Sequence, residues 1–202
     1  MEMRDEILRF YEQNAAEYAR QAAEDWDPGS LKAFCEQVVK AHEQSSGGHS
    51  ETAPRILDAG CGAGRDLNYF KEAGFEAEGF DGSSALVEIA TRESGPKVWR
   101  ADFRMLSLPK ESYDGIWAYR SLIHLPPEGC QRAMASFFSA LRPGGILLVA
   151  FDFGEALKTE PKTYQHSGEA MASWLKQGGF AVISAGENPR APERKIILAR
   201  RL

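Results

Sequence analysis

Apolar residues near the start of the chain recur at intervals of three and four, the spacing of one helix face. The first such stripe lies in residues 4–22 and consists of Ile7, Leu8, Tyr11, Ala15, Tyr18, Ala19 and Ala22. The second follows Asp27-Pro28, a pair typical of a helix start, and consists of Leu31, Phe34, Cys35, Val38 and Val39. Residues 44–52 are polar and show no period, so we expect a flexible connection there. The pattern predicts two amphipathic helices followed by a linker.

After residue 54, short apolar runs alternate with helical patterns. The predicted strands are 56–57, a run ending near Phe80, 97–100, 115–119 and 146–151. The predicted helices cover 67–73, a segment capped by Ser83 or Ser84 that contains Leu86, Val87, Ile89 and Ala90, and a segment from Pro126-Pro127 to Leu141, followed by a turn at 143–145. This alternation favours a parallel sheet with crossover helices. A last helix around Met171 precedes strands 180–184 and 196–199, which we expect to be antiparallel.

Composition narrows the class of protein. The 202 residues and 43% apolar content suit one domain with a packed core. No apolar run approaches the roughly 20 residues needed to span a bilayer, and the charged start lacks a secretory signal, so a cytoplasmic location is expected. The three cysteines are widely spaced and are expected to be reduced thiols. A net charge of −5 disfavours a nucleic-acid partner. No metal site is expected, since His42, His49 and His166 lack ligand spacing.

The densest chemical signal is the segment Asp58-Ala-Gly-Cys-Gly-Ala-Gly64 at the end of the first predicted strand. Its glycines clear a path for a nucleotide-like ligand at the carboxyl edge of the sheet. Their spacing differs from the G-x-G-x-x-G of dinucleotide sites, no G-K-[ST] follows, and Asp58 would repel a pyrophosphate. The segment therefore suits a ligand with a positive amino-acid portion and an adenosine but no phosphate.

Four motifs in order give the sequence a resemblance to class I S-adenosylmethionine-dependent methyltransferases, from about Arg55 to the end. These motifs are Asp58–Gly64, Gly79–Ser84, Ala101–Arg104 and Leu141–Gly145. The resemblance implies a single-domain Rossmann-like α/β fold: a seven-stranded, mostly parallel sheet with an antiparallel last strand, helices on both faces and an N-terminal helical lid. It divides the chain into a lid at residues 1–52 and a core at 53–202 that form one compact unit.

The same resemblance implies that S-adenosyl-L-methionine is the cofactor and S-adenosyl-L-homocysteine the product. The Asp81 carboxylate would accept both ribose hydroxyls, and the Asp102 carboxylate together with the following backbone N–H would recognise adenine. Arg65 either reaches the cofactor carboxylate or lies on the surface. The cofactor-binding residues predicted in this way are Tyr18, Asp58, Gly60, Cys61, Gly62, Arg65, Asp81, Gly82, Ser83, Ala101, Asp102, Phe103 and Tyr119.

Within this family the sequence is most similar to the small bacterial type-11 enzymes, including tellurite-resistance methyltransferases. The similarity lies in Arg9–Ala19, which looks like their lid helix, and in Ile116–Pro126, which looks like their fourth-strand segment. Arg120 departs from the pattern, because small residues are more common at that position. The acceptor pocket of this chain is therefore expected to have its own chemistry.

Tyr11, Arg120 and His124 are the predicted substrate residues. His124 either acts as a general base or only bonds the loop backbone, and Arg120 either clamps an anion or pairs with an acid. The favoured function is in-line methyl transfer to a small molecule at oxygen, nitrogen or a softer atom such as sulfur, selenium or tellurium. The alternatives are an RNA or protein methyltransferase and a non-catalytic cofactor-binding protein, while the glycine spacing disfavours a nicotinamide enzyme. A monomer and a homodimer both remain compatible with the sequence.

Overall fold

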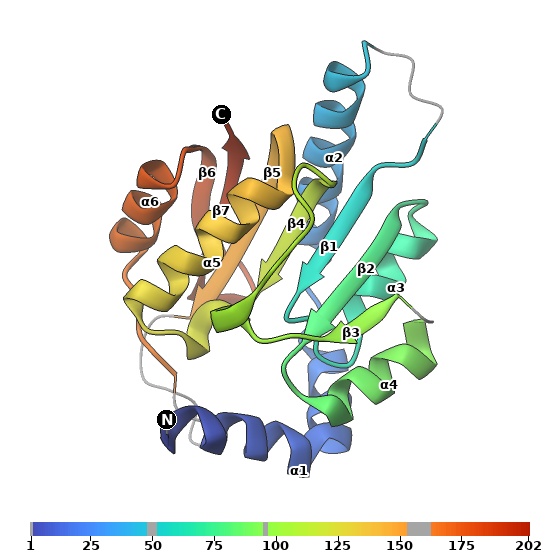
Figure 1. Ribbon diagram of the computed structural model, residues 1–202, viewed down its shortest axis with the longest axis vertical. Coiled ribbons are helices and arrows are strands. Elements are labelled where there is room, and N and C mark those ends of the chain that lie inside the picture. The colour runs from blue at the N-terminus through green and yellow to red at the C-terminus, as the bar shows by residue number, and fades with distance from the viewer. Residues whose placement is uncertain (1, 48–51, 95–96, 153–162) are drawn as a thin grey trace.

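A single seven-stranded sheet forms the centre of the computed structural model, which describes residues 2–47, 52–94, 97–152 and 163–202. The strand order is β3-β2-β1-β4-β5-β7-β6 (Figure 1). The strands are β1 (Arg55–Ala59), β2 (Glu76–Asp81), β3 (Val98–Arg100), β4 (Tyr113–Tyr119), β5 (Leu141–Asp152), β6 (Phe180–Asn188) and β7 (Ala191–Arg201). Strands β1 to β5 pair in parallel, and β7 pairs antiparallel with both β5 and β6. The predicted fold class is confirmed.

Two strand predictions need correction. Strands β6 and β7 form a hairpin that extends well beyond the predicted 180–184 and 196–199, because its outer part carries polar side chains with little apolar signal. Leu141 was predicted to lie in a helix, but it pairs with Tyr113 as the first residue of β5. The predicted turn at 143–145 is an irregularity inside that strand, where the pairing moves from Tyr113–Leu141 to Gly115–Ile146.

Helices cover both faces of the sheet. On one face α2 (Pro28–Ser45), α3 (Arg65–Glu72) and α4 (Ser84–Ser94) contribute Phe34, Leu67 and Ala90 to a core that includes Trp117. On the other face α5 (Pro127–Ala140) and α6 (Gly168–Gln177) contribute Phe137 and other apolar residues to a second core. Neighbouring residues of β4 and β5 supply the two cores in turn, since side chains alternate across a strand. The apolar runs of the central strands follow from this double burial.

The two N-terminal helices have different positions. Helix α1 (Glu2–Glu24) crosses the edge of the sheet at which the parallel strands end (Figure 1) and contacts α4. Helix α2 packs flat on the sheet, and Phe34 and Val38 are fully buried. The fit is close: a Cβ on Gly115 of β4 would lie 2.6 Å from Val38 Cγ2. We therefore keep the predicted lid as a proposal for α1 only.

Local sequence explains where α2 begins and where α1 bends. Asp27 caps α2, since its Oδ1 accepts the Ser30 N–H at 3.1 Å. Asn14 has a non-helical backbone inside α1, so this helix has a kink between its two halves. Helix α2 continues to Ser45, so only part of the expected connection remains, and residues 48–51 lie outside the described part of the chain. Among the described helices, none is long and apolar enough to cross a membrane.

Candidate active site

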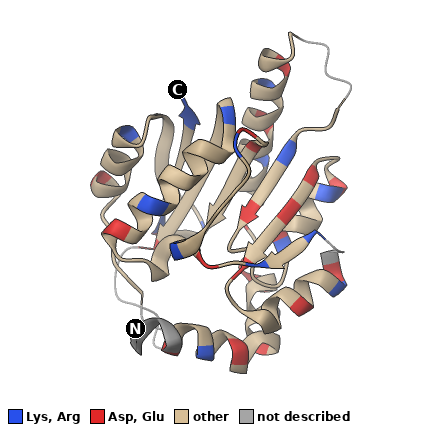
Figure 2. Cartoon of the chain, viewed as in Figure 1, with Lys and Arg blue, Asp and Glu red and all other residues tan. Residues whose placement is uncertain are grey.

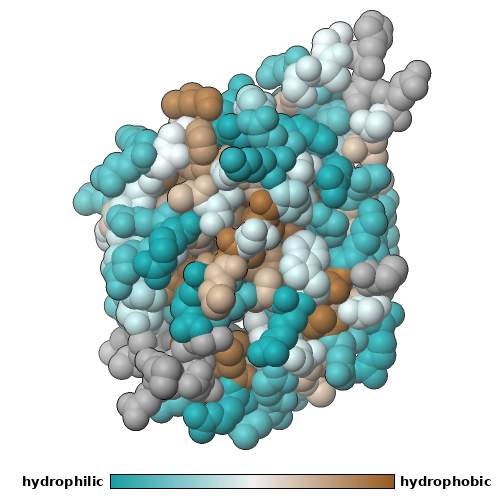
Figure 3. All heavy atoms as spheres, viewed as in Figure 1, coloured by the Kyte–Doolittle hydropathy of each residue, from teal (hydrophilic) through white to brown (hydrophobic). Residues whose placement is uncertain are grey.

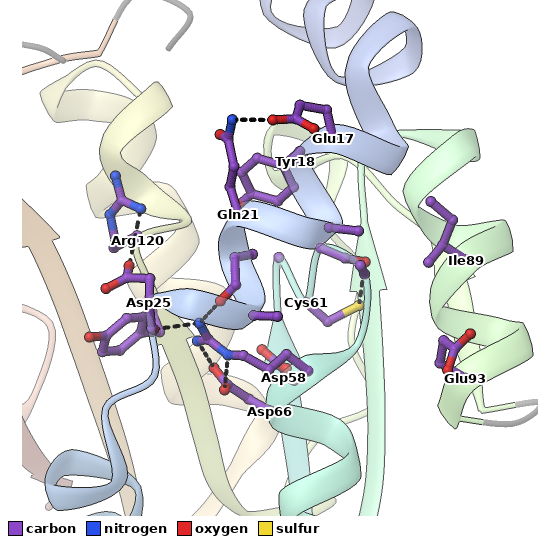
Figure 4. Close-up of a pocket in the computed structure, with 18 of the residues that line it drawn as sticks. Glu17, Tyr18, Gln21, Asp25, Asp58, Cys61, Asp66, Ile89, Glu93 and Arg120 are labelled. Carbon is purple, nitrogen blue, oxygen red and sulfur yellow. Dashed lines mark hydrogen bonds and ion pairs between the residues drawn. The ribbon is translucent and has the colours of Figure 1, made fainter. Parts of the chain in front are cut away.

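Two adjoining cavities lie where the parallel strands end beneath α1. The first, the loop cavity, has a volume of about 760 Å³ and surrounds the glycine segment after β1 (Figure 4). The second, the β3 cavity, has a volume of about 560 Å³ and extends past the ends of β2 and β3. Four residues line both cavities: Tyr18, Gly60, Tyr119 and Arg120. Ligands of open parallel sheets bind at this edge, so the position matches the one predicted from the strand ends.

The glycine segment needs its glycines for backbone shape and for space. Gly60, Gly62 and Gly64 all have positive φ angles, of 80°, 54° and 85°. A Cβ on Gly60 would lie 2.4 Å from Ser121 Cβ, and one on Gly62 would lie 3.3 Å from the Tyr18 ring. The backbone therefore lies close both to Ser121, which follows β4, and to Tyr18 of α1.

Asp58 has a buried carboxylate with one unsatisfied oxygen. The residue is 3% exposed and lines the loop cavity. Its Oδ2 is buried and has no hydrogen-bond partner among the described residues. Burial, together with the nearby Asp66 carboxylate, raises the pKa of Asp58 well above its ordinary value. An unpaired buried carboxylate is costly, and a cationic group in the loop cavity would relieve that cost.

Asp81 joins the glycine segment to the end of β2. Its Oδ2 accepts the Gly62 N–H at 3.0 Å, and its Oδ1 accepts the Ser83 N–H at 2.9 Å. Burial raises the pKa of Asp81, although these backbone donors lower it in part. The carboxylate also lines the β3 cavity. It is therefore fixed in orientation while it still faces a space that a ligand can enter.

Several other predicted cofactor residues also surround the β3 cavity. Gly82, Ala101, Asp102 and Phe103 line it, and Phe103 packs edge-on against Phe80 with ring centroids 5.1 Å apart. The Asp102 carboxylate accepts a hydrogen bond from Arg104 Nη2 at 2.8 Å. Asp102 also begins the short helix η1 (Phe103–Met105). A ligand amine at Asp102 would therefore share that carboxylate with Arg104.

Three other predicted cofactor residues, Ser83, Cys61 and Tyr119, are largely buried and have structural contacts of their own. Ser83 is fully buried and does not line either cavity; its Oγ accepts the Leu86 N–H at 3.3 Å, which confirms it as the cap of α4. Cys61 lines the loop cavity, and burial raises the pKa of its thiol, which keeps it protonated. Tyr119 presents its ring to both cavities while its hydroxyl donates to Asp27 Oδ2 at 3.2 Å, and burial raises its pKa to about 12.

Arg65 connects the core to the end of α1. Its Nη1 donates to the carbonyls of Ala22 and Asp25, both at 2.6 Å, while Nε and Nη2 donate to Asp66. The guanidinium lines the loop cavity, but these contacts occupy its donors. We therefore propose that Arg65 positions α1, in place of the predicted contact with the cofactor carboxylate.

The first half of α1 meets the residues after β4. Tyr11 Oη and His124 Nε2 are 2.9 Å apart, and the Tyr11 ring packs edge-on against Tyr18 at 5.0 Å. His124 ends the short helix η2 (Leu122–His124), and all three residues line the β3 cavity or its boundary. The structure therefore brings together the predicted base and two predicted aromatic residues of α1.

Arg120 lies between the two cavities with a strained backbone. Its φ angle is +56°, which is uncommon for a residue with a side chain. Its Nε donates to Asp152 Oδ2 at 2.7 Å, and its Nη1 lies 3.5 Å from Asp25 Oδ2. The pairing with acids, one of the two expectations for Arg120, is thus present.

Sequence reasoning missed three residues of this region. Asp25 and Arg194 form ion pairs beside Arg120, and Glu12 binds the start of α4 by accepting the Ser84 and Ala85 N–H groups at 2.6 and 3.0 Å. Glu12 could have been noticed as the polar position beside Tyr11 in a predicted lid. Arg194 carried no signal, because the strand that holds it was not predicted to extend so far.

The remaining histidines make structural contacts. His42 Nδ1 lies 2.9 Å from Asp114 Oδ1, and His166 Nε2 lies 3.0 Å from the Leu125 carbonyl. His49 lies outside the described residues. Within the described ranges, no group of three or more potential ligands is placed to hold a metal ion. Basic and acidic residues are interspersed along the visible helices and strands (Figure 2). The face seen in Figure 3 is mainly hydrophilic, with smaller apolar groups.

Comparisons with known proteins agree with this architecture. Residues 56–145 match the model of a methyltransferase domain. A curated S-adenosyl-L-methionine-dependent Diels-Alderase from Talaromyces variabilis is 36% identical over 100 residues, which make up 45% of this chain and 34% of that protein. The chain spans between 34% and 47% of the length of this relative and of three others, all three of which are named methyltransferases.

Solved structures match over nearly the whole chain. The magnesium protoporphyrin IX methyltransferase of Synechocystis with bound S-adenosylmethionine gives a TM-score of 0.71 at 19% identity, covering 100% of this chain and 98% of that one. A TehB-like S-adenosylmethionine-dependent methyltransferase from Corynebacterium glutamicum gives 0.69 at 18% identity, covering 94% and 99%. At these identities the matches show the fold. Residues 56–145 therefore match a methyltransferase domain, and the chain as a whole has the fold of S-adenosylmethionine-dependent methyltransferases.

Proposed function

We propose that this protein binds S-adenosylmethionine and transfers its methyl group to a small-molecule acceptor. The observation that carries the proposal is the unpaired, buried Asp58 oxygen in the loop cavity. The ammonium group of the cofactor's methionine portion is a suitable partner for it, since it supplies both a positive charge and N–H donors. A pyrophosphate would instead add negative charge beside Asp58, which argues against a dinucleotide.

The other cavity residues fit the rest of the cofactor. Asp81 would accept the ribose hydroxyls with a carboxylate already fixed by Gly62 and Ser83. Ala101, Asp102 and Phe103 would hold the adenine in the β3 cavity. Glycine at positions 60 and 62 leaves room for the ligand to lie against the backbone. The adjoining cavities together give the cofactor a continuous path from Asp58 to Asp102.

The acceptor would approach from the side of α1 and the end of β4. When bound, the cofactor supplies an electrophilic methyl group that an acceptor attacks in line, so alignment and exclusion of water are the main tasks of the chain. Tyr11 and Tyr18 of α1 would cover the reaction space. His124 would accept a proton from a hydroxyl or amine nucleophile, with the Tyr11 hydroxyl holding its ring in place.

A second candidate function rests on the similarity to a Diels-Alderase. That relative aligns with 45% of this chain and is named an S-adenosyl-L-methionine-dependent Diels-Alderase, not a methyltransferase. Binding of the cofactor without methyl transfer would be the corresponding function here. Mass spectrometry distinguishes the two candidates, because only methyl transfer adds a methyl group to the acceptor.

The raised pKa of Asp58 leads to a pH prediction. Burial favours the neutral carboxyl in the free protein, whereas the ligand's ammonium group favours the carboxylate, so binding releases a proton. Affinity for S-adenosylhomocysteine should therefore increase as the pH rises above the ordinary range of an aspartate carboxyl, which titrates at about pH 4. Calorimetry in buffers of different ionisation enthalpy measures both the affinity and the proton release. Asp58→Asn should bind more weakly and lose most of this pH dependence; an equally steep profile in the variant would contradict the assignment.

The His124 side chain has a separate test. If it is the base, His124→Ala should lower the methylation rate at saturating acceptor by about a hundredfold or more, because general bases contribute that much. Tyr11→Phe removes only the hydroxyl that bonds His124 and should have a smaller effect, within about tenfold. A His124→Ala rate within a few fold of the parent would leave His124 with a structural role at η2.

A further inference from the structure

Two arginines and two aspartates form a closed ring of ion pairs beside the loop cavity. Arg120 follows β4, Asp152 ends β5, Arg194 lies on β7, and Asp25 lies on the connection between α1 and α2. Each aspartate bridges both arginines. Asp152 accepts the two Nε groups, at 2.7 Å from Arg120 and 2.8 Å from Arg194. Asp25 accepts the two Nη1 groups, at 2.8 Å from Arg194 and 3.5 Å from Arg120.

The two aspartates of this ring are not equivalent. Asp152 ends β5, which pairs with β4 and β7, and it is not among the residues that line either cavity, so it can hold the guanidinium groups from the sheet. Asp25 lies in a short connection, and its side chain is 36% exposed and points toward Arg120 (Figure 4). It lines the loop cavity together with both arginines. It also makes the longest contact of the ring. Asp25 is therefore the member that an incoming anion could replace.

We propose that Arg120 and Arg194 form a binding site for a carboxylate on the methyl acceptor, and that Asp25 occupies this site as an internal substitute until the acceptor displaces it. This inference rests on the proposed function and names the class of acceptor. An acceptor carboxylate would receive the same two Nη1 groups that Asp25 receives now, a bridging geometry that suits a planar anion. The net charge of the site would stay the same, because one carboxylate replaces another.

The surroundings of the ring support the exchange. Burial raises the pKa of Asp25, but the hydrogen bond and charge of Arg194, with the charges of Arg120 and Arg65, lower it overall, so the site favours an anion. Arg65 holds the Asp25 backbone carbonyl, and the side chain can therefore rotate away while the end of α1 stays in place. Glu17, Glu93 and Glu193 also line the cavity, but all three are exposed and their charges are screened by water, while Asp66 is paired with Arg65. Aromatic rings of Phe10, Tyr18 and Tyr119 line the same cavity.

Removing the internal carboxylate should expose the site. We would titrate the full chain with benzoate, and with benzamide as its uncharged counterpart, in the presence and absence of S-adenosylhomocysteine. Because a tethered carboxylate competes at a high effective concentration, Asp25→Ala should bind benzoate at least tenfold more tightly than the parent. Benzamide affinity should change less than twofold. The matched control is Glu24→Ala, which removes an exposed carboxylate one residue earlier and should leave benzoate affinity within twofold of the parent.

A double variant, Asp25→Ala with Arg120→Gln, should lose the gain in benzoate affinity. The proposal is overturned if Asp25→Ala gains no more than Glu24→Ala, or if benzamide gains as much as benzoate, since that would mean only a larger cavity. Circular dichroism of each variant establishes that it is folded. Asp25→Asn keeps the shape of the side chain and should also bind benzoate more tightly than the parent. Failure of S-adenosylhomocysteine to bind would contradict the proposed function alone, because the benzoate titration without it still reports on the arginine pair.

Discussion

Asp81→Ala should weaken binding of S-adenosylhomocysteine by a factor of about 10² to 10⁴. The carboxylate is expected to accept two ribose hydroxyls, and each charge-assisted hydrogen bond contributes about 1.5–3 kcal/mol. Its orientation does not depend on the ligand, because Gly62 and Ser83 already donate to both oxygens. Titration calorimetry of parent and variant measures the effect.

Two controls separate ribose recognition from a change in the loop. Glu76→Ala removes an exposed carboxylate from the other end of the same strand and should leave the affinity unchanged. The parent should bind the 2′-deoxy analogue of S-adenosylhomocysteine more weakly than the natural ligand. Asp81→Ala should bind the two ligands with about the same affinity. A variant that still discriminates between the two ligands as strongly as the parent would show that Asp81 does not read the ribose.

Phe34→Ala should destabilise the fold by about 3–5 kcal/mol, the cost typical of removing a buried aromatic side chain. Phe34 belongs to α2 and is completely buried between this helix and its neighbours. Its ring centroid lies 5.3 Å from that of Trp117 and 5.8 Å from that of Phe70. If α2 were part of a lid that opens, the same substitution would cost far less. Denaturant unfolding followed by fluorescence gives the free energy of unfolding.

The exposed residue Glu36 on the same helix provides the comparison for Phe34. Glu36→Ala should change the free energy of unfolding by less than about 0.5 kcal/mol. A loss below about 1 kcal/mol for Phe34→Ala would mean that α2 is not an integral layer of the core.

Much of the core was predictable from sequence because its signals are local. The alternation of apolar runs and helical stripes predicted the parallel strands, Ser83 was one of two predicted caps for α4, and the glycine segment marked the cavity. These features depend on residues close together in the chain. The structure contains them because burial on both faces of the sheet favours the same strands and helices as the local sequence does.

The outer part of the β6–β7 hairpin and the ring around Arg120 were not predictable. The outer part of the hairpin is polar, so its strand structure comes from pairing with a neighbour and not from its own pattern. Asp25 and Arg194 are 169 positions apart in sequence, and no motif connects them. Helix α2 was grouped with α1 because both are amphipathic, and a periodic stripe does not say which surface it will cover.

The proposed activity is methyl transfer from S-adenosylmethionine to a small-molecule acceptor. Its most direct test is to incubate the protein with S-adenosylmethionine carrying a trideuterated methyl group and a panel of small acceptors that includes carboxylates, and to follow products by mass spectrometry. We expect one acceptor to gain a single labelled methyl group, with one S-adenosylhomocysteine released per product, and no gain with Asp81→Ala. An acceptor that is converted without any gain in mass, while the cofactor remains intact, would contradict methyl transfer and favour a cyclisation.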